Sequence, residues 1–237
     1  MSIADPEDDY QNPREDHRLG LAGQVYDALV TMILSEELVP LQPLRIHSLA
    51  RKLGVSATPV REALVRADAI GIVQRENNKG FRVAPRPAAA ELEDLFEARI
   101  VVEAKTASLA AMHADAELIE HLERTWEYQQ SWGAKQSFAS FRGFLDADRE
   151  FHALIAKAAG NRFLSSALEM LGSHVQRYRS FDDQVVTDQA ETLVEHRGII
   201  EALRDMNALA AESAMTLHLA NLRSRVRQER AAQKSRG

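Results

Sequence analysis

The spacing between apolar residues differs before and after about residue 88 of this chain. From about residue 88 onward, apolar side chains recur every three to four residues over long stretches, which is typical of amphipathic helices. Glycine or polar breaks occur at residues 133, 160–161, 182–183 and 205–207. The pattern predicts six helices that pack as an antiparallel bundle, at about residues 88–113, 115–132, 137–159, 162–180, 187–205 and 207–230.

The pattern before residue 88 predicts a short helix, a turn and a second helix. Leu49 and Leu53 give the short helix an apolar face, and Gly54 supplies the left-handed residue that ends it. Thr58 is suited to be the N-cap of the second helix, because its hydroxyl can accept an unpaired amide hydrogen. Pro59 is suited to the first helical position, where its missing N–H costs nothing.

The second helix is predicted to have two distinct faces. Its inward residues would be Val60, Ala63, Leu64 and Ala67, and its outward residues Thr58, Arg61 and Val65. Arg61 can bind a guanine edge with two hydrogen bonds or contact a phosphate. The helix N-terminus favours phosphate as well. The outward face is therefore the surface that a DNA major groove would meet.

Two short β runs follow, with a polar tip between them. Residues 72–74 and 81–83 are predicted strands, and residues 77–80 form a tip of types that tolerate positive φ. Lys79 at that tip would reach the DNA backbone or the minor groove. Together with the two helices, this order predicts a winged helix-turn-helix.

Charge separates this hypothesis from a helical hairpin with no DNA-binding role. Residues 40–86 contain nine basic and three acidic side chains, a formal charge of +6, in a chain whose net charge is −6. A basic segment in an acidic protein favours a nucleic-acid partner. We expect double-stranded DNA to be bound by Arg45, Arg51, Ser56, Thr58, Arg61, Arg66, Lys79 and Gly80.

The segment Gly54-Val55-Ser56 followed by Thr58-Pro59-Val60-Arg61-Glu62-Ala63-Leu64 resembles the signature of GntR-family winged-helix repressors. The resemblance implies a transcriptional regulator, which we expect to be a repressor. One residue departs from the pattern: the family usually has an arginine that contacts DNA where this chain has Ala57. Base recognition would then depend more on Thr58, Arg61 and Arg66.

Length and composition place these parts in two domains. The 237 residues suffice for a DNA-binding domain at 20–85 and an all-helical domain at 86–230, with a disordered tail at 1–19 and a frayed tail at 231–237. The chain has no cysteine, which excludes disulfides and thiolate metal ligands. No apolar run approaches the roughly 18 residues of a membrane span, so we expect a cytoplasmic protein without a membrane partner.

Four polar residues interrupt the apolar stripes of the helical half. Asp148 and His152 lie one helical turn apart among Phe144, Phe151 and Ile155. His196 and His218 occupy the apolar stripes of two other predicted helices. A single buried histidine is usually structural, but one carboxylate and three imidazoles directed at one interior favour a site for Zn²⁺, Ni²⁺, Mn²⁺ or Fe²⁺.

The segments Asp148-Arg149-Glu150-Phe151-His152 and Glu195-His196-Arg197-Gly198-Ile199, with His218, resemble the metal site of the FCD effector domain found in FadR- and VanR-type regulators. The resemblance implies that Asp148, His152, His196 and His218 bind the metal. Six bundle helices favour the VanR-like subgroup.

A small carboxylate effector is expected beside the metal. Arg99 and Glu103 lie one turn apart on an apolar stripe, either as a buried ion pair or as part of an effector site. The resemblance implies that an arginine here helps to bind an anionic effector, since a guanidinium can bind a carboxylate with two hydrogen bonds. We also assign Asn161 and His174 to effector binding.

Two further expectations concern assembly and chemistry. A homodimer is expected, because paired winged helices read the two halves of a palindromic operator. The alternative function is a metal-dependent enzyme that uses the Asp/His₃ site, with Glu150 or Glu195 as general base. Glu150 is predicted to project off the buried stripe and Glu195 to point away from His196, so neither is well placed as a base and we do not expect an enzyme.

Overall fold

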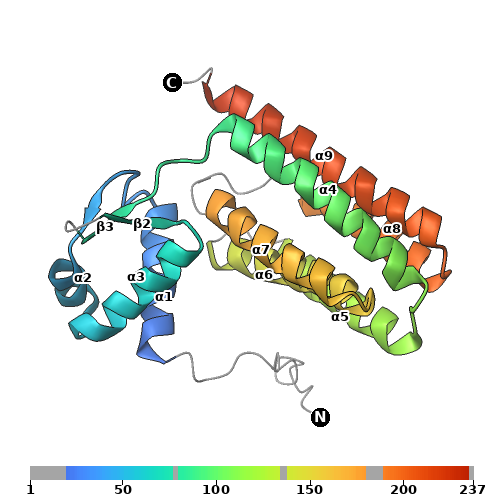
Figure 1. The fold of residues 1–237 in the computed structure, drawn as a ribbon, viewed down its shortest axis with the longest axis horizontal. Helices are drawn as coiled ribbons and strands as arrows, with labels where there is room; N and C mark the ends of the chain where they lie inside the picture. The colour runs from blue at the N-terminus through green and yellow to red at the C-terminus, as the bar shows by residue number, and fades with distance from the viewer. Residues whose placement is uncertain (1–19, 77–79, 134–137, 180–188, 235–237) are drawn as a thin grey trace, which may run out of the picture. The chain divides into compact units, whose positions relative to one another are not determined.

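The structure is a computed structural model that describes residues 20–76, 80–133, 138–179 and 189–234. It divides into two compact units, residues 1–85 and 86–237 (Figure 1). The predicted tail at 1–19 lies outside the described residues, as does Lys79. The tail predicted from residue 231 is helical as far as Lys234, because the last helix continues to that residue.

The first unit is a winged helix-turn-helix, as predicted. Its three strands form an antiparallel sheet in the order β1-β3-β2, with Val73 paired to Val83 and Glu76 to Gly80. Its elements are α1 (Leu21–Leu34), β1 (Pro43–Leu44), α2 (Ile46–Leu53), α3 (Ala57–Ala69), β2 (Val73–Glu76) and β3 (Gly80–Val83). Helix α1 and strand β1 complete the unit and were not anticipated from the pattern.

The turn between α2 and α3 follows the prediction in one part and departs from it in another. Gly54 ends α2 in the left-handed conformation, with φ of 67°. The predicted N-cap at Thr58 is wrong, because α3 begins at Ala57 and its N-cap is Ser56. Pro59 is nevertheless accommodated in the first turn, where backbone N–H groups have no helical partner.

Helix α3 buries the four residues predicted to face inward, Val60, Ala63, Leu64 and Ala67. They pack within the first unit, where α1 lies against α3 and contributes Tyr26 and Leu29 to the core. The opposite face of α3 carries exposed Thr58, Arg61 and Val65. The hydrophobic core therefore holds α3 with its polar face toward solvent.

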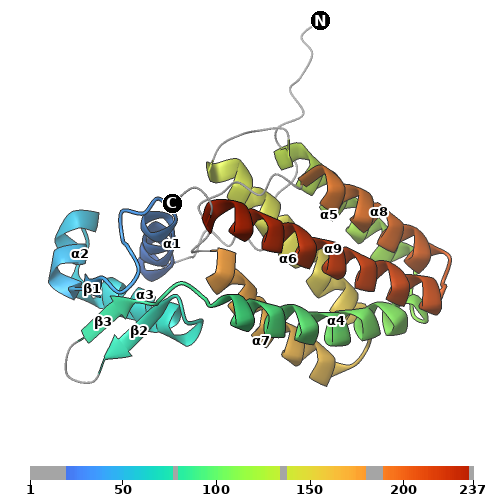
Figure 2. The same ribbon diagram turned by 90° about the horizontal axis from the view of Figure 1, so that it is seen from above.

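The second unit is a bundle of six helices within its described residues, which confirms the predicted fold class. Figures 1 and 2 show α4 running antiparallel to α9, and α5 packs along both α6 and α8. The helices are α4 (Ala89–Ala111), α5 (Ala116–Gly133), α6 (Phe138–Ala158), α7 (Arg162–Arg179), α8 (Gln189–Arg204) and α9 (Ala208–Lys234). None of the helices in the described parts of the chain is long and apolar enough to cross a membrane.

A large apolar core joins five helices of the bundle. Its buried members come from α4, α5, α6, α8 and α9; those of α4 are alanines, and the largest members are Leu122, Phe151, Ile155, Ile199, Ile200, Leu203, Met215 and Leu219. Protein interiors are close-packed, so side chains next to this cluster have little freedom to move. The core thereby fixes the polar residues on the same helix faces.

The contact between α5 and α6 depends on a glycine. A Cβ atom added at Gly143 of α6 would lie 2.5 Å from the Trp132 ring. In an exposed helix interior, glycine is about 1 kcal/mol less favourable than alanine. Here its missing side chain admits the indole, so packing outweighs helix propensity.

Gly143→Ala is expected to lower the free energy of unfolding of the bundle by about 1–3 kcal/mol, because the new methyl group overlaps the Trp132 ring. Gly172→Ala on α7 is the matched control, since its Cβ would meet nothing within 4 Å. That change should raise stability by up to about 1 kcal/mol. Denaturant unfolding measures both, and a Gly143→Ala variant as stable as the control variant would contradict the packing role of this glycine.

Candidate functional site

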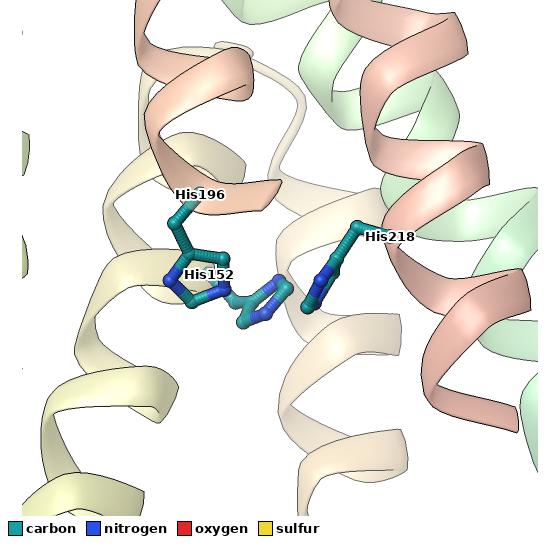
Figure 3. Close-up of side chains that lie close together, drawn as sticks. All are labelled: His152, His196 and His218. Carbon is teal, nitrogen blue, oxygen red and sulfur yellow. The ribbon is translucent and has the colours of Figure 1, made fainter. Parts of the chain in front are cut away.

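Three histidines from three helices converge in the interior of the bundle. His152 of α6, His196 of α8 and His218 of α9 are 5% exposed or less, and one nitrogen of each lies within 4.8 Å of the others. The centroids of the His196 and His218 rings are 4.8 Å apart, and those of His152 and His218 are 5.3 Å apart. Figure 3 shows the three imidazoles pointing toward one another.

Asp148 lies beside this cluster, one turn before His152 on α6. Its Oδ1 atom is 3.6 Å from His196 Nε2 and 3.9 Å from His152 Nε2. The carboxylate is buried, with 4% of the residue exposed. The structure thus brings together all four residues that the sequence singled out as metal ligands.

The opposite side of each imidazole faces an acceptor from a different helix. His196 Nδ1 lies 2.9 Å from Gln129 Oε1, and His218 Nδ1 lies 2.8 Å from Glu195 Oε2. His152 Nδ1 lies 2.6 Å from Glu103 Oε2, a close contact that is not aligned as a regular hydrogen bond. An acceptor at Nδ1 favours a proton on that nitrogen and leaves the lone pair on Nε2.

In the described part of the bundle, the nitrogens that face one another lack hydrogen-bond partners. Among the described residues, the Nε2 atoms of His152, His196 and His218 are buried and have no hydrogen-bond partner. Each such polar atom costs about 1–3 kcal/mol when left unsatisfied. A cation bound between them would accept all three lone pairs, so this donor set fits a divalent transition metal.

Burial also determines the charge of two of these rings. Desolvation lowers the pKa of His218, and desolvation is also the largest cause that lowers the pKa of His196 well below its usual value. Both imidazoles are therefore neutral at neutral pH. Neutral imidazole is the form that binds a metal without first releasing a proton.

Arg99 and Glu103 form the buried ion pair that the sequence left as one of two possibilities. Arg99 Nε donates to Glu103 Oε1 over 2.6 Å, and both residues are almost fully buried. Burial alone would raise the pKa of Glu103, but the charge of Arg99 and its hydrogen bond lower it to about 2. Glu103 is thus ionised and joins Arg99 to His152.

Glu195 has a role that the sequence did not reveal. Besides His218 Nδ1, its carboxylate accepts hydrogen bonds from Asn221 at 2.9 Å and from both terminal nitrogens of Arg225, at 2.8 and 3.0 Å. Burial would raise its pKa, but these hydrogen bonds lower it to about 2. An ionised carboxylate occupied in this way is a poor general base.

Gln129 was also missed. It lies on α5, is fully buried, and contacts His196 across the interior. Its position on the apolar face of α5 was the available signal, because buried amides need partners.

The other two residues assigned to effector binding have different surroundings. Asn161 caps α7, since its Oδ1 atom accepts from the amides of Phe163 at 3.1 Å and Leu164 at 3.3 Å. His174 is exposed on α7. Within the described residues, neither forms a hydrogen bond or ion pair with the histidine cluster.

The predicted DNA-binding residues in the described part of the first unit are exposed: Arg45, Arg51, Ser56, Thr58, Arg61, Arg66 and Gly80. The Ser56 hydroxyl makes no capping hydrogen bond, so it remains available at the start of α3. Arg66 differs from the others because its guanidinium lies 4.2 Å above the Tyr26 ring. Gly80 begins β3 with φ of 93°, a conformation that favours glycine at the wing.

Comparisons with known proteins agree with this arrangement. The FCD domain family matches residues 94–221, and the gntR family of bacterial regulatory proteins matches residues 21–83. A protein of Paenarthrobacter nicotinovorans, named a probable D-xylose utilization operon transcriptional repressor, is 31% identical over 86% of this chain and 87% of its own length. The Uxu operon transcriptional regulator of Escherichia coli is 26% identical over 76% of each chain.

Solved structures share the fold. McbR/YncC of Escherichia coli superimposes with a TM-score of 0.67 over 89% of this chain and 99% of its own, at 20% identity. Lar of Listeria monocytogenes does so with a TM-score of 0.61 over 88% and 97%, at 23% identity. With a gntR-type DNA-binding unit followed by an FCD domain, the chain belongs to the GntR family of transcriptional regulators.

Proposed function

We propose that the protein is a homodimeric repressor whose bundle binds a divalent transition metal and a small organic acid, and whose winged helices bind a palindromic operator. The observation that carries the metal proposal is the cluster of three buried Nε2 atoms that have no hydrogen-bond partner among the residues that the structure describes. Asp148, His152, His196 and His218 would hold the ion. Bound there, the metal would supply a Lewis-acidic centre for oxygen ligands.

The donor set narrows the class of metal. Three imidazoles and one carboxylate suit Zn²⁺, Ni²⁺, Mn²⁺ or Fe²⁺, whereas Mg²⁺ and Ca²⁺ prefer oxygen ligands. Four protein ligands leave coordination positions open on metals that accept five or six ligands. An effector with carboxylate or hydroxyl oxygens could occupy such positions.

The charges around the cluster favour an anionic effector. Among the described residues at the cluster, Asp148, Glu103 and Glu195 contribute three negative charges and Arg99 and Arg225 two positive ones, a sum of −1 without the imidazoles. A divalent ion would change this sum to +1. A singly charged carboxylate would neutralise it, and buried charges are costly when uncompensated.

Within this proposal, Arg99 and Glu103 belong to the effector site because Glu103 contacts His152 directly. Asn161 contributes as the cap that positions the start of α7, and His174 is an exposed candidate on the same helix. Because one relative is named for a D-xylose utilization operon, sugar-derived acids are among the compounds to test, with D-xylose itself beside them.

The proposed mechanism is a shift between two states. An effector that binds one arrangement of the bundle more tightly would favour the orientation of the winged helices that goes with it. Dimerisation follows from the proposed operator, since one winged helix reads only one half-site. A metal-dependent enzyme is not favoured, because Glu195 is held by Arg225 and His218.

A binding titration with operator DNA tests whether metal and effector in the bundle control DNA binding. Removing the metal with a chelator, or adding the right organic acid to the metal-loaded protein, should change operator affinity. His196→Ala should remove both responses while leaving basal DNA binding intact, because His196 is at the centre of the cluster and outside the DNA-binding unit. Fluorescence anisotropy with labelled operator measures the affinity.

His113→Ala is the matched control, since His113 is an exposed histidine of the same unit. It should respond to chelator and acid as the unmodified protein does. The metal assignment would be wrong if His196→Ala kept its response to both.

Arg61→Ala tests the DNA-binding face. It should weaken operator binding about 10- to 100-fold, because a guanidinium on the exposed face of α3 is lost. The salt dependence of the remaining affinity should become less steep if Arg61 contacts a phosphate. The bundle should still bind metal.

Arg124→Ala is the control for charge, because Arg124 is exposed on α5 of the other unit and pairs with Glu120. The Arg124→Ala variant should bind the operator as tightly as the unmodified protein does. Equal losses in the two arginine variants would mean that net charge, and not the α3 face, determines DNA binding.

A further inference from the structure

The His196 ring is fixed in place by its neighbours. It stacks on Phe151 with centroids 4.0 Å apart and planes within 7° of parallel, and it is fully buried. On one side it meets Gln129 through Nδ1, at 2.9 Å. On the other its Nε2 atom faces Asp148 Oδ1 at 3.6 Å. A ring so confined cannot easily turn, but its proton can occupy either nitrogen.

The position of that proton decides whether His196 can bind a metal. With the proton on Nδ1, Gln129 Oε1 accepts it, and the Nε2 lone pair faces the cluster. With the proton on Nε2, the inner nitrogen has no lone pair for a metal and is directed toward the Asp148 carboxylate. The two acceptors on opposite sides of the ring therefore favour opposite tautomers.

Gln129 differs from the other two residues that face an Nδ1 atom. Glu103 and Glu195 are carboxylates that each accept from an arginine, Arg99 or Arg225, and a carboxylate held in this way accepts hydrogen bonds. The amide of Gln129 can accept through its oxygen or, when reversed, donate through its nitrogen. Its Nε2 atom is buried without a hydrogen-bond partner in the described residues, so no second contact there opposes the reversal.

We propose that Gln129 is a positioning residue that selects the Nδ1–H tautomer of His196 and thereby makes its Nε2 atom available to the metal. The proposal rests on the proposed metal-binding function. Metal binding and the orientation of one buried amide are then coupled. A residue on α5, which supplies no metal ligand, would control the affinity of a site built on α6, α8 and α9.

The test compares Gln129→Met, which removes the acceptor at similar length, with Gln129→Glu, whose ionised carboxylate keeps an acceptor and cannot donate. Gln130→Met is the matched control, because Gln130 is the exposed neighbour on the same helix. Zinc affinity is measured by competition with a chromophoric chelator. The tautomer of His196 is measured in the metal-free protein from its two ¹⁵N ring shifts, assigned by comparison with His196→Ala.

Gln129→Met should bind zinc about 10- to 100-fold more weakly, the range found for residues that orient metal ligands, and its His196 should shift toward the Nε2–H form. Gln129→Glu should retain the Nδ1–H form and bind zinc at least as tightly as the unmodified protein. Gln130→Met should change neither measurement.

Two results would overturn the role of Gln129: zinc affinity in Gln129→Met equal to that of Gln130→Met, or an Nε2–H tautomer in Gln129→Glu. The tautomer of His196 in Gln129→Glu can be measured even if Gln129→Met does not fold. Failure of the unmodified protein to bind zinc, nickel, manganese or iron would instead reject the metal-binding function. The tautomer measurement would still report on Gln129 in that case.

Discussion

The main physical constraint on this structure is the burial of one polar cluster inside an apolar bundle, where water cannot hydrogen-bond to it. Three imidazoles and a carboxylate are buried away from water, so each of their polar atoms needs a hydrogen-bond or metal partner inside the bundle. The Nδ1 atoms of the three histidines face Glu103, Gln129 and Glu195, while their Nε2 atoms have no hydrogen-bond partner in the described residues. The centre of the cluster therefore lacks a hydrogen-bond partner in the described residues, and the cation that we propose to bind there would supply one.

Several helices of the bundle contribute residues to this cluster. Helices α6, α8 and α9 supply the imidazoles, and α4, α5 and α8 supply the residues behind them. Helix α9 continues past Arg225 to contacts with the beginning of the unit: Arg227 pairs with Glu93, and Arg230 donates to the Pro87 carbonyl at 3.3 Å. The helix that bears His218 thus also binds the residues that connect the bundle to the preceding unit.

Periodicity predicted the elements of this protein well, and contacts between helices poorly. The six bundle helices and the converging histidines follow from which face of each helix is apolar. Gln129 and Glu195 could not be assigned, because their partners lie on helices far away in sequence. The N-cap of α3 was misplaced by two residues, since proline is tolerated throughout the first helical turn and does not mark one position.

X-ray absorption spectroscopy of the metal-loaded protein tests the central claim most directly, because it reports the ligands of the ion itself. With zinc bound, the first shell should contain three imidazole nitrogens at about 2.0–2.1 Å together with oxygen ligands at about 2.0–2.2 Å. A shell with fewer than two imidazoles, or one unchanged when His152, His196 and His218 are replaced, would contradict it.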